Sequence, residues 1–271
     1  MILKPNCKIN LGLKVVRKRK DGFHDIESVF YPAGLSDTIE INYPADGQFR
    51  FSGSGIPIPG DPGSNLCIKA FELMKSRFRI PAVTVHLNKA IPVGSGLGGG
   101  SSDGAFILKA LNEMFLLGLK TDELKDFASS LGSDCVFFIE NIPVVAKGRG
   151  DVLAEVAVNL QGFFLMIVVP PVYINTAEAY SMVHPAEPAT SVEEIIRQPV
   201  SRWKELLIND FEEIICKKYP LIRRIKEILY ENNAVYSSMS GSGSAVYGLF
   251  RQAPRLEGLF PGCFVWMSSQ L

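Results

Sequence analysis

The sequence has no excess of charge of either sign, no paired cysteines and no long hydrophobic run. Its 271 residues include 28 Lys and Arg against 28 Asp and Glu, so the formal net charge is zero. A balanced charge argues against a nucleic-acid-binding surface and against attraction to an anionic membrane. Any anionic ligand must therefore be held by a local arrangement of groups. We expect no nucleic acid and no membrane among the partners.

The five cysteines are an odd number, are widely spread and form no C-x-x-C pair. They also lack neighbouring histidines at the spacing of metal ligands. This pattern predicts reduced thiols in a cytoplasmic protein rather than disulfides or a zinc site. The most apolar run, "FFLMIVVPPVYI", is short and contains two prolines, and the first ten residues have no long apolar core. We expect neither secretion nor a membrane span.

A hydrophobic content of 47% over this length supports a substantial core in two domains or one large one. Alternating apolar and polar residues predict strands in the following segments: 7–16, 37–43, 48–53, 82–91 and 144–156. Helical spacing and capping residues predict helices in segments 66–78, 121–132, 191–198 and 220–233, with Thr121 as the cap of the second. The third is predicted to start with a capping box of Ser191 and Glu194, and the fourth to bury Ile222, Ile225 and Leu229 on one face. A composition break after this first group of strands places a domain boundary at residue 158.

The stretch "PVGSGLGGGSSDGAF", residues 92–106, contains six glycines and three serines. Ile107, Leu108 and Leu111 follow it at helical spacing, with Ser102 or Asp103 as the expected N-cap. Glycines let backbone N–H groups converge, and a helix N-terminus adds unpaired N–H groups and a positive dipole end. The stretch is therefore a candidate polyphosphate-binding loop.

Three other interpretations compete for this loop. Gly94, Gly96 and Gly99 satisfy the dinucleotide pattern G-x-G-x-x-G, but that pattern is weak in a glycine-rich segment and needs an acidic residue at a following strand end. Glu113 lies near the required distance but falls within the predicted helix. The loop lacks the G-K-[ST] ending of a Walker A motif. A flexible connector is the remaining alternative.

Five segments together resemble the GHMP small-molecule kinases. "KAIPVGSGLGGGSS" resembles the ATP-binding motif of that family, and "PNCKINLGL", "DGFHDIESVF", "LGSDCVFF" and "SGSGSAVYGLF" resemble, in order, the other signature segments of one of its members. The resemblance implies an α+β, two-domain GHMP kinase fold with the active site in the cleft between the domains. Residues 1–158 would form the N-terminal domain with the glycine-rich ATP loop, and residues 159–271 the C-terminal α+β domain.

The resemblance also implies the reaction. It is ATP-dependent phosphorylation of the 2-hydroxyl of a cytidine diphosphate derivative of methylerythritol, in the non-mevalonate route to isoprenoid precursors. Mg²⁺ accompanies the ATP. In the family, the residue matching Asp134 is the base, and the lysine matching Lys8 sits beside it and the reacting hydroxyl. Without the resemblance, a lone lysine in a strand and an aspartate two residues after a glycine would be interpreted as solvated residues.

The remaining expected contacts follow from the same resemblance. ATP-binding residues are Asn65, Lys89, Pro92, Gly94, Gly96, Gly98, Gly99, Gly100, Ser101 and Ser102, with the serine that contacts magnesium left open. Substrate-binding residues are Asn10, Phe23, His24, Tyr180, Ser240, Gly241, Ser242 and Gly243. Phe23 and His24 would stack on and hydrogen-bond a cytosine ring, and Tyr180 would cover its other face. Core packing is the alternative for Phe23 and His24, and a tight turn before a strand is the alternative for "SGSGS".

Two other functions stay open at this point. A kinase of the same fold acting on mevalonate, homoserine or a sugar would have no use for the "GFH" segment, because those acceptors offer no cytosine ring. A nucleotide-binding protein without turnover would not need both Lys8 and Asp134. The sequence does not indicate the oligomeric state.

Overall fold

The computed structural model describes residues 1–256 and 258–271 and divides into two compact units. The first unit contains Met1–Cys7, Ala33–Val93 and Gly98–Ile142, and the second contains Lys8–Pro32, Gly94–Leu97 and Pro143–Leu271. Both units mix helices and strands, as expected for an α+β protein. The division of the chain at residue 158 stays a prediction, because these units group residues by contact and are discontinuous in sequence.

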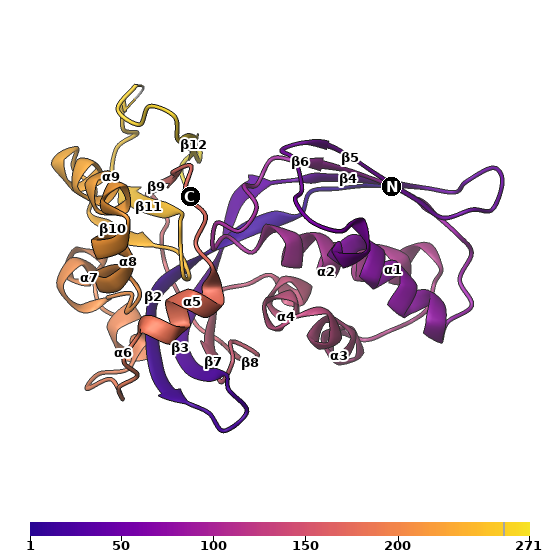
Figure 1. Cartoon of the computed structure of the whole chain (residues 1–271), viewed down its shortest axis with the longest axis horizontal. Coiled ribbons are helices and arrows are strands. Elements are labelled where there is room, and N and C mark those ends of the chain that lie inside the picture. Colours follow the sequence, from indigo (N-terminus) through magenta and orange to yellow (C-terminus); the bar gives the residue numbers. More distant parts are fainter. Residues whose placement is uncertain (257) are drawn as a thin grey trace. The chain divides into compact units, whose positions relative to one another are not determined.

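The first unit contains a four-stranded sheet with strand order β1-β4-β6-β5. Its elements are β1 (Ile2–Leu3), β4 (Thr38–Asn42), β5 (Arg50–Gly55), β6 (Thr84–Lys89), the short 3-10 helix η1 (Pro62–Ser64), α1 (Leu66–Arg77), α2 (Gly99–Met114), α3 (Thr121–Leu131) and α4 (Ser133–Glu140). Strands β5 and β6 are parallel, and α1 lies in the connection between them, as a parallel crossover requires. In Figure 1, α1 and α2 lie along one side of this sheet.

Alternation explains why this sheet forms. In β4 and β6, every second residue is buried, including Ile39, Ile41, Val85 and Leu87, and Ile39 pairs directly with Leu87. One face of the sheet is therefore apolar and packs into the core. On the helix side, Gly104 lets α2 approach α1 closely, since a Cβ there would lie 3.0 Å from the Cβ of Leu66.

The second unit is built on two further four-stranded sheets, ordered β2-β3-β7-β8 and β10-β11-β9-β12. Its elements are β2 (Asn6–Lys18), β3 (His24–Ser36), β7 (Val144–Lys147), β8 (Val152–Glu155), β9 (Phe164–Val169), α5 (Thr176–Met182), α6 (Val192–Ile196), α7 (Val200–Leu206), α8 (Glu212–Lys218), α9 (Pro220–Glu231), β10 (Tyr236–Met239), β11 (Val246–Phe250) and β12 (Phe264–Met267). β2 begins, and β3 ends, with residues that belong to the first unit.

Helix α9 shows how the sequence pattern builds the core of this unit. Pro220 occupies its first turn, where a missing N–H costs nothing, and Ile222, Ile225 and Leu229 are buried, as predicted. These three side chains join a cluster with Val246 and Phe250 of β11. The helix is amphipathic, so its apolar stripe faces the sheet and its charged face meets solvent.

Three local predictions are wrong. Helix α2 begins at Gly99, and its N-cap is Gly98 in the left-handed conformation rather than Ser102 or Asp103. Helix α3 includes Thr121 and is preceded by Lys120, whose backbone N–H donates to the Glu123 carboxylate at 2.9 Å. Segment 144–156 is not one strand but a hairpin of β7 and β8. In each case a local turn or cap, and not the sequence pattern, determines where the helix or strand begins or ends.

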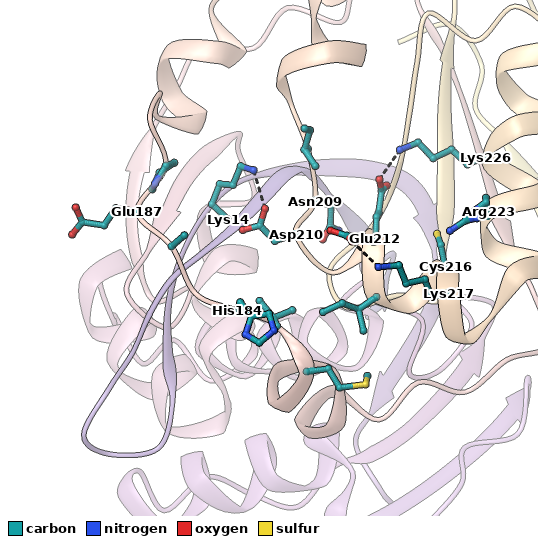
Figure 2. Close-up of a pocket in the computed structure, with 17 residues that line it drawn as sticks. Lys14, His184, Glu187, Asn209, Asp210, Glu212, Cys216, Lys217, Arg223 and Lys226 are labelled. Atoms are coloured by element: carbon teal, nitrogen blue, oxygen red, sulfur yellow. Dashed lines mark hydrogen bonds and ion pairs between the residues drawn. The ribbon is translucent and has the colours of Figure 1, made fainter.

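The second unit has a cavity of about 840 Å³, lined chiefly by residues 182–188 and 208–217 together with Lys14, Arg223 and Lys226. Figure 2 shows these side chains. Several of the charged side chains form ion pairs: Lys14 contacts Asp210 at 2.8 Å, and Lys226 contacts Glu212 at 2.5 Å. None of the predicted site residues lines this cavity. In the described part of the chain, every helix falls short of the length and apolarity that crossing a bilayer requires.

Candidate active site

The glycine loop leads directly into helix α2. Gly94, Gly96 and Gly98 all have positive φ, at 67°, 82° and 72°, a conformation that glycine adopts without strain. Because α2 begins at Gly99, the N–H groups of its first turn come from Gly99, Gly100 and Ser101 and have no acceptor within the helix. The loop therefore presents backbone donors and a positive dipole end, the arrangement that binds phosphate.

Two side chains in the first turns of α2 have buried atoms that lack a described partner. Ser102 is fully buried, and its Oγ has no hydrogen-bond partner among the described residues. Asp103 is 2% exposed, and its Oδ1 also has no hydrogen-bond partner among the described residues. Buried polar atoms are nearly always bonded, so an unsatisfied oxygen at a phosphate-binding loop points to a ligand or a titrating group.

Magnesium fits this donor set only together with a nucleotide. Mg²⁺ prefers oxygen ligands and is commonly held by one or two protein groups plus substrate phosphates. The hydroxyl of Ser102 is such an oxygen, and Ser101 precedes it in the same turn. Within residues 1–256 and 258–271 there is no group of three or more His, Cys, Asp or Glu side chains that would hold a metal ion alone.

Lys89 is buried just before the glycine loop begins. Its ammonium is 3% exposed and contacts Asp37 Oδ2 and, at 2.8 Å, Asp103 Oδ2. Burial lowers its pKa, but Asp103 and Asp37 outweigh burial and raise it, so Lys89 stays charged. In the structure, the Lys89 ammonium forms ion pairs with two carboxyl groups. Direct contact of Lys89 with ATP stays a prediction. Sequence reasoning missed Asp37, which stands 52 residues before Lys89 and in no motif.

Asn65 and the proline-rich loop before it border a second cavity, in the first unit. Its volume is about 490 Å³, and residues 51–62, Ser64 and Asn65 line it. The Asn65 Oδ1 accepts from the backbone N–H of Cys67 at 2.8 Å and so caps α1. The volume matches an ordinary small-ligand site, and the lining includes Ile56, Pro57 and Ile58.

Lys8 is held in place by a buried network in the second unit. The side chain is 3% exposed, its Nζ donates to Asn10 Oδ1 at 2.5 Å, and it lies 4.5 Å from the centroid of the Phe30 ring. The Asn10 amide in turn donates to Ser28 Oγ at 2.9 Å, and Ser28 donates to the Gly12 carbonyl at 2.6 Å. The network fixes the orientation of the Asn10 amide and therefore the position of the ammonium.

Asp134 is in the first turn of α4, where a carboxylate is favoured by the helix dipole. Gly132 precedes the helix and ends α3, so the two helices are separated by this glycine alone. Asp134 belongs to the first unit and Lys8 to the second. The convergence of the two side chains on one acceptor hydroxyl stays a prediction.

The predicted cytosine-binding residues lie around the turn between β2 and β3. Phe23 is 56% exposed, and the Arg149 guanidinium lies 5.3 Å from its ring centroid. His24 stacks on Tyr180, with ring centroids 5.0 Å apart and planes 20° apart. Tyr180 also contacts the edge of Phe211. Tyr180 therefore stacks on His24, and its place over a cytosine ring stays a prediction.

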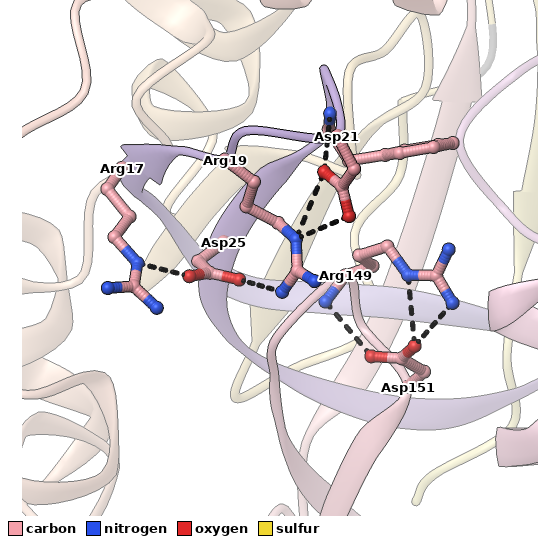
Figure 3. A network of polar contacts seen from close by, with 7 residues as sticks. Arg17, Arg19, Asp21, Asp25, Arg149 and Asp151 are labelled. Atoms are coloured by element: carbon pink, nitrogen blue, oxygen red, sulfur yellow. Dashed lines mark hydrogen bonds and ion pairs between the residues drawn. The ribbon is translucent and has the colours of Figure 1, made fainter.

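A charged network, shown in Figure 3, orients this turn. Arg19 contacts Asp25 at 2.8 Å and Asp21 at 3.0 Å, and Asp21 accepts from the backbone N–H of Phe23 at 3.1 Å. Arg149 contacts Asp151 at 3.0 Å. Because most of these groups are accessible to solvent, which screens their charges, the network holds the geometry of the turn more than it stabilises the fold.

The turn formed by Ser240, Gly241, Ser242 and Gly243 packs on the middle of the glycine loop. The Ser240 hydroxyl donates to the Gly96 carbonyl at 2.9 Å, and the N–H of Ala245 donates to the Ser95 carbonyl at 3.0 Å. A Cβ on Gly96 would lie 2.1 Å from the Ser240 carbonyl oxygen. Asn209, which sequence reasoning missed, donates to the Gly241 carbonyl at 2.8 Å. Asn209 stands in none of the motifs recognised in the sequence.

Two family models match the chain. "GHMP kinases N terminal domain" matches residues 65–141, and "GHMP kinases C terminal" matches residues 191–258. Together they cover the glycine loop, Asp134 and the late glycine turn. The predicted α+β GHMP kinase fold is therefore confirmed. The placement of the active site in a cleft between the two domains stays a prediction.

The chain is also similar to named proteins. A 4-diphosphocytidyl-2-C-methyl-D-erythritol kinase of Parabacteroides distasonis is 50% identical over 268 residues, covering 98% of each chain. A crystal structure of 4-(cytidine 5'-diphospho)-2C-methyl-D-erythritol kinase has a TM-score of 0.80 at 28% identity and covers 92% of this chain and 90% of its own. The mevalonate kinase of Methanococcus jannaschii has a TM-score of 0.74 at 15% identity, covering 100% and 98%, which shows a shared fold alone.

Proposed function

The chain belongs to the GHMP kinase family, and we propose that it transfers the γ-phosphoryl group of ATP to the 2-hydroxyl of 4-diphosphocytidyl-2-C-methyl-D-erythritol. The observation that carries the choice of acceptor is 50% identity, over nearly the full length of both chains, to a kinase of that name. The reaction is a step of the non-mevalonate route to isoprenoid precursors. Four of the five free cysteines are buried, and we place the reaction in the cytoplasm, where thiols stay reduced.

The glycine loop supports the binding of ATP. Positive φ at Gly94, Gly96 and Gly98 turns the backbone, and the first-turn N–H groups of α2 provide donors for phosphate oxygens. Magnesium, when bound with the nucleotide, neutralises charge on the transferring group. We assign Ser101 and Ser102 to contact with this magnesium ion. The Ser102 Oγ is buried and has no hydrogen-bond partner among the described residues. The apolar cavity at Asn65 is the place we assign to the adenine.

Lys8 and Asp134 are assigned to the acceptor hydroxyl. A buried ammonium stabilises negative charge as it develops on the attacking oxygen and favours the ionised form of a nearby carboxylate. The Asp134 carboxylate accepts the hydroxyl proton, either early or after the phosphoryl group has begun to move. The Asn10 amide, fixed by Ser28, keeps the Lys8 ammonium in position.

The test of the reaction is a substrate panel. Purified protein with ATP and Mg²⁺ is mixed with 4-diphosphocytidyl-2-C-methyl-D-erythritol, mevalonate, homoserine or galactose, and ADP release is followed. We expect release above background with the cytidine compound alone. Release with mevalonate and not with the cytidine compound would favour a GHMP kinase for another alcohol. Tight ATP binding without release for any acceptor would favour a nucleotide-binding protein.

His24 should discriminate the cytidine group. Burial, and then the charge of Lys18, lowers the pKa of His24, so the ring is neutral at pH 7 and offers one donor and one acceptor to a cytosine edge. A His24→Phe variant keeps an aromatic ring beside Tyr180 but loses both polar atoms. We expect the KM for the cytidine substrate to rise about tenfold, the loss of one or two hydrogen bonds, with the KM for ATP unchanged.

Steady-state kinetics with each substrate varied in turn would measure this split. In the wild type, the KM for the cytidine substrate should also rise as the pH falls below the lowered pKa of His24, because the protonated ring loses its acceptor. The variant should lack this acid rise. An equal rise of both KM values would indicate a general folding defect and contradict the assignment.

A further inference from the structure

Asn10 in β2 has a hydrogen-bond partner at each of its four polar groups. Its side-chain oxygen accepts from Lys8 Nζ at 2.5 Å, and its side-chain amide donates to Ser28 Oγ at 2.9 Å. Its backbone N–H donates to Ser240 Oγ at 3.2 Å, and its backbone carbonyl accepts from the Tyr247 hydroxyl at 2.7 Å. All of these side chains are buried. The position of the Lys8 ammonium therefore depends on three separate segments of the second unit.

The same network joins Lys8 to the glycine loop. The Ser240 hydroxyl, which accepts from the Asn10 N–H, donates to the Gly96 carbonyl at 2.9 Å. The backbone N–H of Lys8 donates to the Leu97 carbonyl at 2.9 Å. Lys8 is thus bonded to the loop directly through its backbone, and indirectly through Asn10 and Ser240. Gly96 and Leu97 belong to the second unit, as Lys8 does, so all of these bonds lie within one compact unit.

Tyr247 is the most rigid part of this network. It lies in the central strand β11, paired with Ser238 of β10 on one side and Ile167 of β9 on the other, so its backbone is held from both sides. Lysine, in contrast, carries its ammonium on a flexible four-carbon stem and takes one position only where other groups restrain it. A buried carbonyl that loses its donor is destabilised, so the Tyr247 hydroxyl restrains the Asn10 peptide.

We propose that Tyr247 and Ser240 are positioning residues for phosphoryl transfer. They hold Asn10, and through Asn10 the Lys8 ammonium, at a fixed place relative to the glycine loop. A misplacement of about 1 Å at a reacting centre costs about 10²-fold in rate, so this restraint acts on turnover. For Ser240 the role is indirect, in place of the direct substrate contact that the resemblance implies. The inference rests on the proposed function, because it assumes that Lys8 acts on the acceptor hydroxyl.

The first test is Tyr247→Phe, which keeps the ring and removes the hydroxyl. We expect kcat to fall about tenfold, the loss of one hydrogen bond, with the KM values for ATP and for the acceptor within about twofold of the wild type. Steady-state kinetics with each substrate varied in turn would measure this split. An unchanged kcat, or a rise of both KM values, would overturn the positioning role of Tyr247.

Tyr230→Phe is the matched control. The Tyr230 hydroxyl donates to the Ser237 carbonyl and accepts from the Ser237 N–H, both at 3.1 Å, and it has no bond to Asn10 among the described residues. The control therefore loses two hydrogen bonds of the same unit and should keep the wild-type kcat. An equal fall of kcat in both tyrosine variants would show a general structural effect and would also overturn the proposal.

Ser240→Ala removes the acceptor of the Asn10 N–H and the donor to the Gly96 carbonyl together. We expect a lower kcat and a KM for ATP that rises about tenfold, because the glycine loop loses a bond, with the KM for the acceptor unchanged. A rise in the KM for the acceptor alone would indicate that Ser240 contacts the substrate directly, and would contradict its positioning role.

A Lys8→Met background tests whether Tyr247 acts through Lys8. Once the ammonium is absent, Tyr247→Phe should change the single-turnover rate by less than about twofold, as for groups that act as a unit. A second tenfold loss in this background would show that Tyr247 acts on another part of the site.

The outcomes separate this inference from the proposed function. Wild-type protein that transfers phosphate to none of the offered acceptors would overturn both. Wild-type turnover in Lys8→Met would overturn the role of Lys8 and this inference, and would leave the choice of acceptor intact. If circular dichroism shows that Tyr247→Phe does not fold, Ser240→Ala decides, and an unchanged kcat in that variant overturns the proposal.

Discussion

Replacing Asp134 with asparagine is expected to lower the turnover number by about 10²- to 10⁴-fold, the range that a positioned general base contributes. The amide has nearly the same shape but does not accept a proton from the acceptor hydroxyl. The affinity for ATP should stay within about twofold, since the donors that hold phosphate come from the loop and the start of α2. Single-turnover assays for the transfer and calorimetry for ATP binding would measure the two quantities.

A matched control lies on the same helix. Glu140 at the end of α4 is partly exposed and pairs with Lys125 at 2.6 Å, so Glu140→Gln changes the same functional group without touching the proposed chemistry. It should leave turnover near the wild-type value. Turnover of Asp134→Asn close to the wild type would contradict its assignment as the base.

Lys8 makes this test sharper. If Lys8 and Asp134 act on the same oxygen, the combined loss in Lys8→Met with Asp134→Asn should be much smaller than the product of the single losses, as for groups that act as a unit. Independent, multiplying losses would show that the two side chains serve different steps. This double-mutant cycle therefore tests in solution the convergence that the sequence resemblance implies.

Replacing Gly96 with alanine is expected to raise the KM for ATP by about 100-fold or more and to destabilise the fold. A Cβ at Gly96 would sit 2.1 Å from the Ser240 carbonyl oxygen and 3.1 Å from that of Gly243, so the backbone must move. The residue also has φ of +82°, which costs a non-glycine residue about 1 to 2 kcal/mol. Both effects displace the loop on which the phosphate donors depend.

Gly118→Ala separates the two effects. Gly118 has φ of +71°, but no atom lies within 4 Å of the position that a Cβ would take, so it reports the backbone cost alone. We expect a loss of about 1 to 2 kcal/mol in the free energy of unfolding and an unchanged KM for ATP. Gly96→Ala should exceed this loss in denaturant unfolding. Equal stability losses and an unchanged KM in both variants would show that the contact with Ser240 is not limiting.

The fold could be predicted in large part because its elements depend on short-range patterns. The buried stripe of α9 and the capping box of Ser191 and Glu194 were readable from spacing alone, and the structure confirms both. Helix starts were less predictable. Ser102 and Asp103 are good caps in isolation, but Gly98 in the left-handed conformation begins α2 earlier, because the helix start also depends on packing at Gly99.

The residues of the candidate site also fall into two groups: those that stand in short motifs and those that only the tertiary structure brings to the site. The glycine loop, Lys8, His24 and Asp134 stand in recognisable motifs, so resemblance was enough to select them. Asp37, Asn209 and Arg149 stand in no motif that was used, yet they anchor the loop, support the late glycine turn and contact Phe23. Their roles depend on residues far away in the chain.

The sequence alone determined the helix and strand periodicity, the glycine-rich loop and the family resemblance, because each depends on neighbours within a few positions or on short motifs. It also determined the net charge of zero, which is a sum over the composition. Folding decided that the Lys89 ammonium is buried between Asp37 and Asp103, and that the Ser240 carbonyl leaves no room for a side chain at Gly96. These contacts join residues 14 to 144 positions apart. Such contacts arise from the sum of many weak packing and hydrogen-bonding terms, which no short stretch of sequence contains.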